Sequence, residues 1–511
     1  MPLPPGKSSG VVTAALAFSG MVVSMMFTLV VPIIPDLPRL VSASAEDASW
    51  VITSTLLASA VFTPVSGRLG DMYGKRRMMV ISLALMVVGS AICALTSALP
   101  LVVLGRTLQG CAVGVIPLGI SIMRDLLPPS RMGSAMALMS ATMGAGGAIG
   151  LPLGAVVAQY ANWHVLFLVS AGMGVMGLVL TLALVPDSPL RTGGRFDFAG
   201  VAGLSAGLIC LLLPISKGGT WGWTSPLTLG LFAAAAVILP LWGWAELRVG
   251  NPLVDLRTTT RREVLLTNLA SIAFGFAMFG TQLVFPQVLQ APAGSGYGLG
   301  LSLFDAGLCM AVGGGMMIVL SPVSARVTGA YGPKVTLILG ALLAVSGYVT
   351  ALLLMTEVWH VVLAATIVSA GAGLGYAAMP ASIMSAVPTS ETAAANGFNS
   401  LMRSIGTSMA SAVIGAVLAA QTVRLGTATL PSRGGLEIAL IISAVAATAG
   451  MILSVFLPRR RAAWPGADRQ LTPGRPDTGT RLPGKAASPL AGDAALDVAG
   501  TPGEPGPRRT E

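Results

Sequence analysis

The sequence predicts an all-α integral membrane protein with about 14 transmembrane helices, arranged as two six-helix bundles plus two extra central helices. Composition is the first reason, because 54% of the 511 residues are hydrophobic and only 10% are charged, whereas a soluble protein carries about 25% charged residues. The second reason is a series of apolar stretches long enough to cross a bilayer core about 30 Å thick. The third is the placement of basic residues between those stretches.

The apolar stretches organise the chain in order. Residues 1–10 form a predicted cytoplasmic N-terminus, 11–185 an N-terminal six-helix bundle, 186–263 the two extra helices with their loops, and 264–457 a C-terminal six-helix bundle. Residues 458–511 are rich in Pro, Gly, Arg and Asp without apolar periodicity, which predicts a disordered cytoplasmic tail. The expected spans are 11–31, 49–66, 78–98, 101–123, 134–158, 164–185, 198–216, 226–245, 264–290, 301–323, 335–356, 358–382, 396–420 and 436–457.

Basic residues support this count. With both termini in the cytoplasm, nearly every basic loop falls on the cytoplasmic side, as the positive-inside rule requires. The predicted outer loops keep Arg39, Lys217, Arg424 and Arg433. We therefore expect a multi-pass protein of the plasma (inner) membrane, with the lipid bilayer as its surroundings. The net charge of +10 is explained by topology, and no nucleic acid is expected as a partner.

Several function classes are excluded by residues that the chain lacks. Its two histidines, His164 and His360, both lie at predicted outer boundaries, so neither a catalytic triad nor a His-rich metal site is expected. The four cysteines have neither zinc nor redox spacing. No Walker-type phosphate loop is present, so ATP is not expected as the energy source. We expect no enzyme activity, no cofactor and no metal.

The connection after the second span reads Gly67-x-x-x-Asp71-x-x-Gly74-Lys75-Arg76. Its glycines permit a tight reversal between two helices. Asp71, placed in this loop, is suited to accept charge-assisted hydrogen bonds from basic side chains or from a helix N-terminus. The alternative is a basic loop that only sets topology.

A Tyr-Gly pair followed by a basic residue recurs after the tenth span, at Tyr331-Gly332-x-Lys334. The recurrence fits two related six-span halves separated by two extra helices. Related halves are what alternating-access carriers use, because one half moves against the other around a central site.

Two further patterns lie inside spans. Arg106, Gln109 and Gly110 share one helix face in the fourth span. Because Arg106 is only about 7.5 Å from the predicted outer end, snorkelling to the surface is the alternative to a functional role. In the fifth span, glycines recur at i, i+4 and i+8, which allows close helix packing, and a proline loosens the backbone. These residues are Gly146, Gly150, Pro152 and Gly154.

Together these patterns resemble the major facilitator superfamily, and within it the fourteen-span drug:proton antiporter branch, over roughly residues 11–457. The resemblance implies that the Gly67–Arg76 segment is a gating latch, that Arg106 with Gln109 and Gly110 handles protons or borders the substrate cavity, and that the fifth-span glycines and Pro152 form a hinge. The antiporter signature itself is altered, because Leu151 separates Gly150 from Pro152. The implied function is secondary export of small lipophilic drugs, antibiotics or metabolites by alternating access, with the proton as coupling ion.

The first span departs from the branch, because Val23 stands at its acidic position. No Asp or Glu lies near the middle of any predicted span, although a proton carrier needs a titrating group in its path. Asp305, near the outer mouth of the tenth span, is the candidate acid. The alternatives are a substrate that carries the proton and transport coupled differently or uncoupled. The absence favours neutral, zwitterionic or anionic lipophiles, with Arg106 or Arg403 attracting an anion.

Two other functions remain open. A major-facilitator importer of a small organic nutrient predicts a dense polar site at the membrane midplane. This chain instead offers apolar residues such as Met26, Phe27 and Phe274 to line a cavity. A non-transporting membrane sensor needs neither two related halves nor a latch between them.

Overall fold

The computed structural model describes residues 9–187, 191, 193, 196–425 and 428–458. All of them belong to one compact unit, Met1–Ala467. Residues 1–8 of the predicted N-terminus and all of the predicted tail beyond residue 458 lie outside the described ranges.

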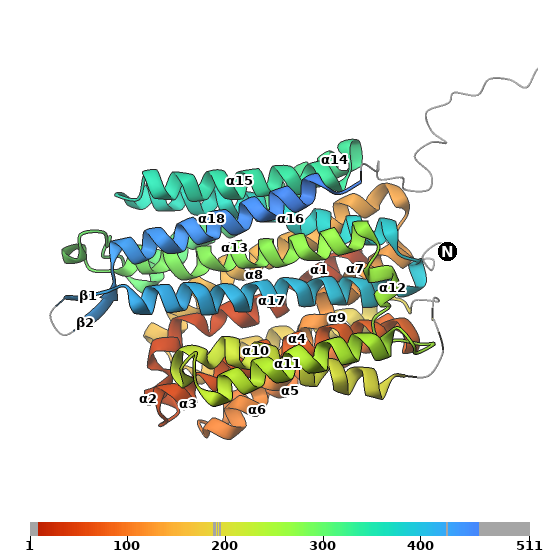
Figure 1. Ribbon diagram of the computed structural model, residues 1–511, viewed down its shortest axis with the longest axis horizontal. Helices are drawn as coiled ribbons and strands as arrows, with labels where there is room; N and C mark the ends of the chain where they lie inside the picture. The colour runs from red at the N-terminus through yellow and green to blue at the C-terminus, as the bar shows by residue number, and fades with distance from the viewer. Residues whose placement is uncertain (1–8, 188–190, 192, 194–195, 426–427, 459–511) are drawn as a thin grey trace, which may run out of the picture. The chain divides into compact units, whose positions relative to one another are not determined.

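Fourteen helical segments in the described part of the chain are long and apolar enough to cross a membrane, which confirms the predicted fold class and span number. Figure 1 shows these long helices lying side by side. One span is interrupted, because α6 (Leu99–Gly110) and α7 (Val115–Leu126) are joined by the short 3₁₀ helix η2 (Cys111–Gly114). The other thirteen spans are α1 (Ser9–Leu29), α4 (Trp50–Tyr73), α5 (Lys75–Leu95), α8 (Pro129–Tyr160), α9 (His164–Leu184), α10 (Phe198–Trp221), α11 (Pro226–Glu246), α13 (Arg262–Gln290), α14 (Leu303–Tyr331), α15 (Pro333–Leu353), α16 (Val358–Ala386), α17 (Thr392–Ala420) and α18 (Arg433–Val455).

Short elements fill the connections. Between α1 and α4 lie η1 (Val31–Asp36), α2 (Leu37–Leu40) and α3 (Ala45–Ala48), and other connections hold α12 (Leu256–Thr259), η3 (Ala293–Ser295) and η4 (Thr389–Glu391). Between α17 and α18, β1 (Thr422–Leu425) pairs antiparallel with β2 (Ala428–Pro431). The Tyr297 hydroxyl donates to the Pro431 carbonyl at 2.7 Å, and burial raises the pKa of Tyr297 above its ordinary value. Sequence reasoning did not predict this hairpin.

Several helices extend past their predicted ends into charged segments. The clearest case is α4, which continues to Tyr73, so Asp71 lies on its last turn. The prediction that Asp71 lies in a loop is therefore wrong. The chain reverses only at Gly74, whose φ of +115° strongly favours glycine. Counting consecutive apolar residues does not detect this extension. The last turns of α4 carry polar residues such as Asp71, whose partners lie on other helices.

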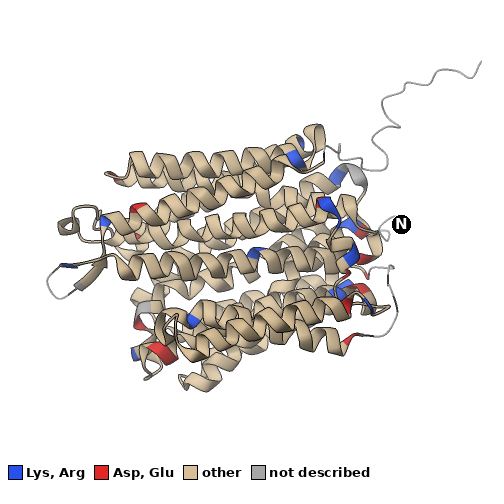
Figure 2. Cartoon of the chain, viewed as in Figure 1, with Lys and Arg blue, Asp and Glu red and all other residues tan. Residues whose placement is uncertain are grey.

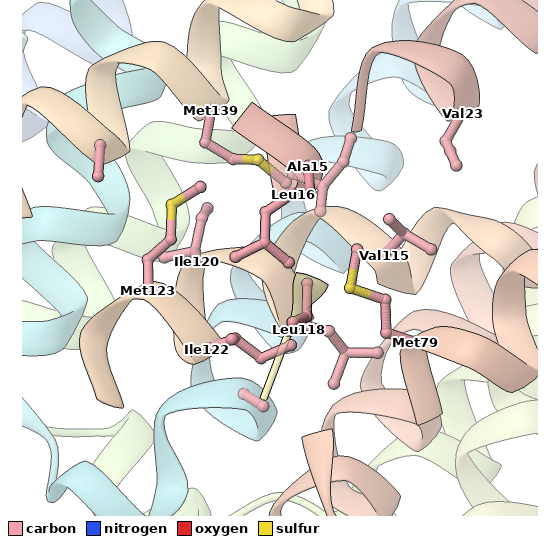
Figure 3. Packing of buried hydrophobic residues seen from close by; sticks show 14 of the residues in the cluster. Ala15, Leu16, Val23, Met79, Val115, Leu118, Ile120, Ile122, Met123 and Met139 are labelled. Atoms are coloured by element: carbon pink, nitrogen blue, oxygen red, sulfur yellow. The ribbon is translucent and has the colours of Figure 1, made fainter. Parts of the chain in front are cut away.

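The core of helices α1–α9, referred to below as the N-terminal half, is made of interlocked aliphatic and methionine side chains. Figure 3 shows Leu16 from α1, Met79 from α5, Leu118 from α7 and Met139 from α8 converging in this cluster. All four are completely buried. Helices α13–α18, referred to as the C-terminal half, have their own buried clusters. The predicted functional division into two moving bundles stays a prediction.

The two halves meet most extensively along two helix pairs, α4 with α17 and α8 with α14, and α8 also contacts α16 while α7 contacts α17. The extra helix α10 packs against both α4 and α17. Its Leu204 and Leu208 share a buried cluster with Val65 of α4 and Leu401 of α17. The extra helix therefore covers the α4–α17 contact between the halves.

Charged residues gather at the two ends of the helices, and few lie between them (Figure 2). This distribution is expected because an unpaired charge within a bilayer costs several kcal/mol. One end holds Asp71, the turn at Gly74 and the start of α17; it is referred to as the Asp71 end. The other holds β1 and β2 and is referred to as the hairpin end.

Candidate functional site

Asp71 joins the two halves of the protein. Its carboxylate accepts hydrogen bonds from the backbone N–H groups of Ala393 at 3.3 Å and Ala394 at 2.8 Å. These are unsatisfied donors in the first turn of α17, where the helix carries a partial positive charge. The side chain is completely buried. Asp71 of α4 therefore caps the N-terminus of a helix that lies more than 300 residues away in the chain.

Lys75 and Asp125 hold Asp71 from within the N-terminal half. The Lys75 ammonium lies 2.7 Å from Asp125 Oδ2 and 3.6 Å from Asp71 Oδ1. The side chains of all three are at most 1% exposed. Because a buried charge needs a partner, the lysine compensates two carboxylates that are brought together from α4 and α7.

Arg124, next to Asp125 on α7, contacts the connection between α16 and α17 in the C-terminal half. Its guanidinium donates to the carbonyls of Met384 at 2.8 Å and Val387 at 3.2 Å, and to Thr392 Oγ1 at 2.6 Å. Those carbonyls are at the C-terminal end of α16, which carries a partial negative charge. An anion thus caps the start of α17 while a cation caps the end of α16.

Close backbone approach supports these contacts. A Cβ atom at Gly67 would lie 2.5 Å from the Ala393 carbonyl oxygen, and one at Gly397 would lie 2.9 Å from the Thr63 carbonyl oxygen. Glycine at both positions lets α4 and α17 meet at backbone distance. The predicted latch residues Gly67, Asp71 and Lys75 therefore lie together at the contact between halves.

Arg76 lies elsewhere. Its guanidinium contacts Asp187 at 3.2 Å and the Leu182 carbonyl at 2.6 Å, both at or just beyond the end of α9, in a partly exposed position. Gly74 forms the turn and does not touch the C-terminal half. The structure thus places two of the five predicted latch residues outside the contact between halves.

The recurrent motif in the second half has no equivalent of Asp71. When Tyr331 is aligned with Tyr73, Gly329 takes the place of the aspartate. Lys334 donates to the carbonyls of Val455 and Leu457 beyond the end of α18, within its own half. The ionic contact between halves is therefore built by the first copy of the motif.

Arg106 is buried inside the N-terminal half. Its Nη1 donates to Gln109 Oε1 at 2.6 Å, and its Nε donates to the Val51 carbonyl of α4 at 3.2 Å. Gln109 donates in turn to Ser90 Oγ of α5 at 2.7 Å. Gly110 lies against the backbone of Thr55 in α4. Arg106 is 2% exposed and does not extend to the surface, and the residues to which it donates these hydrogen bonds belong to the N-terminal half.

The fifth-span glycines face α1. A Cβ at Gly146 would lie 2.5 Å from Ser24 Cβ and 2.7 Å from Met25 N, Gly150 lies against Thr28, and Gly154 lies against Leu29. Thr28 Oγ1 also donates to the Gly146 carbonyl at 3.0 Å. The three glycines of the predicted hinge thus form the contact of α8 with α1 in the same half.

Two other residues of α8 contact the C-terminal half. A Cβ at Gly144 would lie 2.8 Å from the Gly314 carbonyl oxygen of α14, and one at Gly307 of α14 would lie 3.4 Å from Pro152 N. Pro152 is therefore the predicted hinge residue that faces the other half, while Gly144 was missed by sequence reasoning.

Replacing Gly146 with Val is expected to destabilise the protein by about 1–3 kcal/mol, because overpacking forces α1 away from α8. Gly147→Val is the matched control, since a Cβ there has nothing within 4 Å. Melting temperatures of the purified proteins in detergent measure the difference. Equal melting temperatures for the two variants would contradict the tight α1–α8 contact.

Asp305 is exposed at the start of α14, at the hairpin end. Its backbone N–H donates to Ser302 Oγ at 3.1 Å, and its carboxylate accepts from that hydroxyl at 2.7 Å. These are the contacts of a helix cap, which any soluble helix could carry. The structure places the candidate titrating acid outside the contact between halves.

A small cavity lies between the halves, deep among the helices. The N-terminal side is mostly apolar, with Ile116 and Ile120 of α7 and Met143 of α8 beside Ser140. The C-terminal side is polar, with Tyr376 of α16 and a face of α17. That face carries Asn396, Asn399, Ser400 and Arg403. The cavity volume is about 10 Å³, so the halves are nearly closed at this level.

Hydrogen bonds organise the polar side. Asn399 Nδ2 donates to Asn268 Oδ1 at 2.9 Å and to Ser271 Oγ at 2.7 Å, both on α13. Asn268 also lines a larger cavity of about 390 Å³ at the Asp71 end, together with Arg68 and Phe398. The Asn268–Asn399 hydrogen bond therefore connects the lining of the two cavities.

Sequence reasoning named Arg403 but missed the cluster around it. The signal was present: polar residues at 396, 399, 400 and 403 follow the i, i+3, i+4, i+7 pattern of one helix face. The contacts of Arg124 and Asp125 carried no comparable signal. The partners of Arg124 come from distant segments, and its charge fitted the positive-inside rule.

Both the sequence and the fold of this chain match known proteins. A family model described as Major Facilitator Superfamily matches residues 16–406 and, separately, 267–492. The chain is 28% identical over 445 residues to a tetracenomycin C resistance and export protein of Streptomyces glaucescens, covering 84% of this chain and 80% of that protein. It is also 28% identical to the multidrug resistance protein Stp of Mycobacterium tuberculosis, covering 76% of this chain and 72% of that protein.

Among solved structures, that of the human organic anion transporter MFSD10 superposes with a TM-score of 0.63. The match covers 88% of this chain and 100% of that chain at 15% identity, so it concerns the fold alone. The sequence matches confirm the resemblance that the motifs predicted, including the likeness to drug-efflux members. With the helix arrangement, they establish that this chain belongs to the Major Facilitator Superfamily.

Proposed function

We propose that this chain exports small lipophilic compounds across the plasma membrane by alternating access, with the proton as the coupling ion. The names of its relatives support export of antibiotics and other drugs. The observation that carries the proposal is the contact at the Asp71 end, where Asp71 and Arg124 of one half cap the ends of α17 and α16 in the other.

This contact suits a transporter because it is local and reversible. Each charge at a helix end contributes on the order of 0.3–2 kcal/mol. Separating the halves there exposes a few polar groups to water, which can replace the lost hydrogen bonds. A substrate that binds one arrangement more tightly than the other then shifts the balance between them.

The distribution of basic residues gives the proposed orientation of the protein in the membrane. The positive-inside rule puts the Asp71 end in the cytoplasm. The conformation described here then has its cytoplasmic side closed by Asp71 and Arg124. Opening that side would admit substrate, and opening the hairpin end would release it.

The central cavity is the proposed substrate path. A drug-sized ligand needs roughly 300–1,000 Å³, whereas this cavity measures about 10 Å³. The halves must therefore move apart before a substrate is bound there. An indirect role in transport is proposed for Arg106, Gln109 and Gly110, which fix α6 against α4 and α5. Gly146, Gly150, Pro152 and Gly154 support movement of α8.

Accumulation assays test the proposed export. An efflux-deficient bacterium that expresses the chain is given a panel of dyes and antibiotics, with and without a protonophore. We expect lowered accumulation of at least one compound, and loss of that effect when the protonophore collapses the gradient. Export that survives the protonophore would contradict proton coupling alone. Raised accumulation would favour the nutrient importer and overturn export.

A further inference from the structure

We infer that the central cavity recognises lipophilic anions, with Arg403 as the residue that binds the negative group of the substrate. The inference rests on the proposed transport function, because it assigns the substrate class of the same central site. The substrate class consists of molecules with an apolar body and one acidic group, such as a carboxylate, phenolate or enolate.

The positive charge of Arg403 is not paired with a negative charge among the described residues that line the cavity. Its Nη2 makes a long hydrogen bond of 3.4 Å to Ser400 Oγ, and its guanidinium carbon lies 5.0 Å from the centre of the Tyr376 ring. Neither group carries a negative charge. No Asp or Glu is among the described residues that line the cavity.

Arg106 differs in its hydrogen bonds and in its position. It donates to Gln109 at 2.6 Å and to the Val51 carbonyl at 3.2 Å, and these bonds hold it within one half. Arg403 instead faces residues of the other half across the cavity. The sequence left the two arginines as equal alternatives for attracting an anion, and the structure distinguishes them by position and by partners.

A charge without a counter-ion is costly within a membrane protein. An acidic substrate removes that cost by pairing with the guanidinium, which presents its donors in a planar fork suited to a carboxylate. A lipophilic cation would instead meet a like charge, with no carboxylate in the cavity lining to receive it. Electrostatics therefore favours anions over neutral molecules and neutral molecules over cations.

The other residues that line the cavity indicate which further groups the ligand carries. Asn396 Oδ1 is buried and has no hydrogen-bond partner among the described residues, so it can accept a hydrogen bond from a hydroxyl or N–H group of the substrate. Ile116, Ile120 and Met143 offer an apolar wall opposite these polar groups. A hydrophobic acid that also carries a hydroxyl group matches all three features.

Binding to the purified full-length chain in lipid nanodiscs tests the inference. The probes are aromatic carboxylic acids of two- to three-ring size, each paired with its carboxamide of nearly the same shape. We expect at least one acid to bind about tenfold more tightly than its amide. Arg403→Gln should remove the difference by weakening acid binding, while Arg403→Lys should retain part of it.

Arg326→Gln is the control, since it removes an arginine from an exposed position at the end of α14. It should leave the preference for acids unchanged. Melting temperatures of all variants without ligand verify that they are folded. Equal affinity of every acid and its amide for the wild-type chain would overturn the inference, as would a preference for acids that persists in Arg403→Gln.

The same variants separate this inference from the proposed export. If cells expressing the wild type export only neutral or cationic compounds, export stands and the anion site is refuted. If acids bind through Arg403 in nanodiscs but no compound is transported in cells, the site stands and export is refuted.

Discussion

Asp71→Asn is expected to lower transport by at least about tenfold while the protein remains in the membrane. The asparagine side chain has nearly the same shape, but it has lost the negative charge that stabilises the N-terminus of α17. Its amide NH₂ would also face one of the two N–H groups of Ala393 and Ala394 that now donate to the carboxylate. Initial export rates, normalised to the amount of protein in the membrane, measure the effect.

Asp187→Asn is the matched control for this experiment. Asp187 also forms an ion pair at the Asp71 end, with Arg76 at 3.2 Å, but its side chain is 66% exposed and its partner belongs to the same half. An exposed pair of this kind contributes about 0–1 kcal/mol. Transport near the wild-type rate in Asp71→Asn would refute the gating role of the contact between the halves.

Lys75→Met is expected to destabilise the folded protein by about 3–5 kcal/mol, because it removes the cation that compensates the buried Asp71 and Asp125 carboxylates. The Lys75 ammonium is completely buried, 2.7 Å from Asp125 Oδ2. Methionine fills much of the same volume, so the loss of charge dominates the effect. Thermal unfolding in detergent, followed by the fraction of protein that remains soluble, provides the measurement.

A double variant and an exposed pair serve as controls. The double variant Lys75→Met with Asp125→Asn should recover part of the lost stability, because it also removes the negative charge of Asp125 that Lys75 compensates. Arg433→Met should have little effect, since both side chains of the Arg433–Glu437 pair, at 3.0 Å, are exposed. If Lys75→Met were as mild as Arg433→Met, the lysine would have no role in compensating the buried acids.

The membrane architecture was determined by the sequence itself. Hydrophobicity is a local property, so the apolar stretches alone predicted 14 spans that the structure confirms. The prediction failed where helices carry polar residues with tertiary partners, as at the last turns of α4 that contain Arg68 and Asp71. The glycine spacing in α8 correctly indicated close packing, but no spacing rule says which neighbour is packed.

Only the tertiary structure decided which polar residues work together. Asp71 and its donor Ala393 are 322 positions apart, and Arg124 contacts a turn about as distant. Likewise, Arg106 and Arg403 are both arginines within apolar spans, and the sequence could not rank them. They differ in their neighbours: Arg106 donates hydrogen bonds to Gln109 and Val51 of its own half, whereas Arg403 lines a cavity where the two halves meet. Hydrophobic burial depends on each segment alone, while an electrostatic partner depends on how distant segments are brought together.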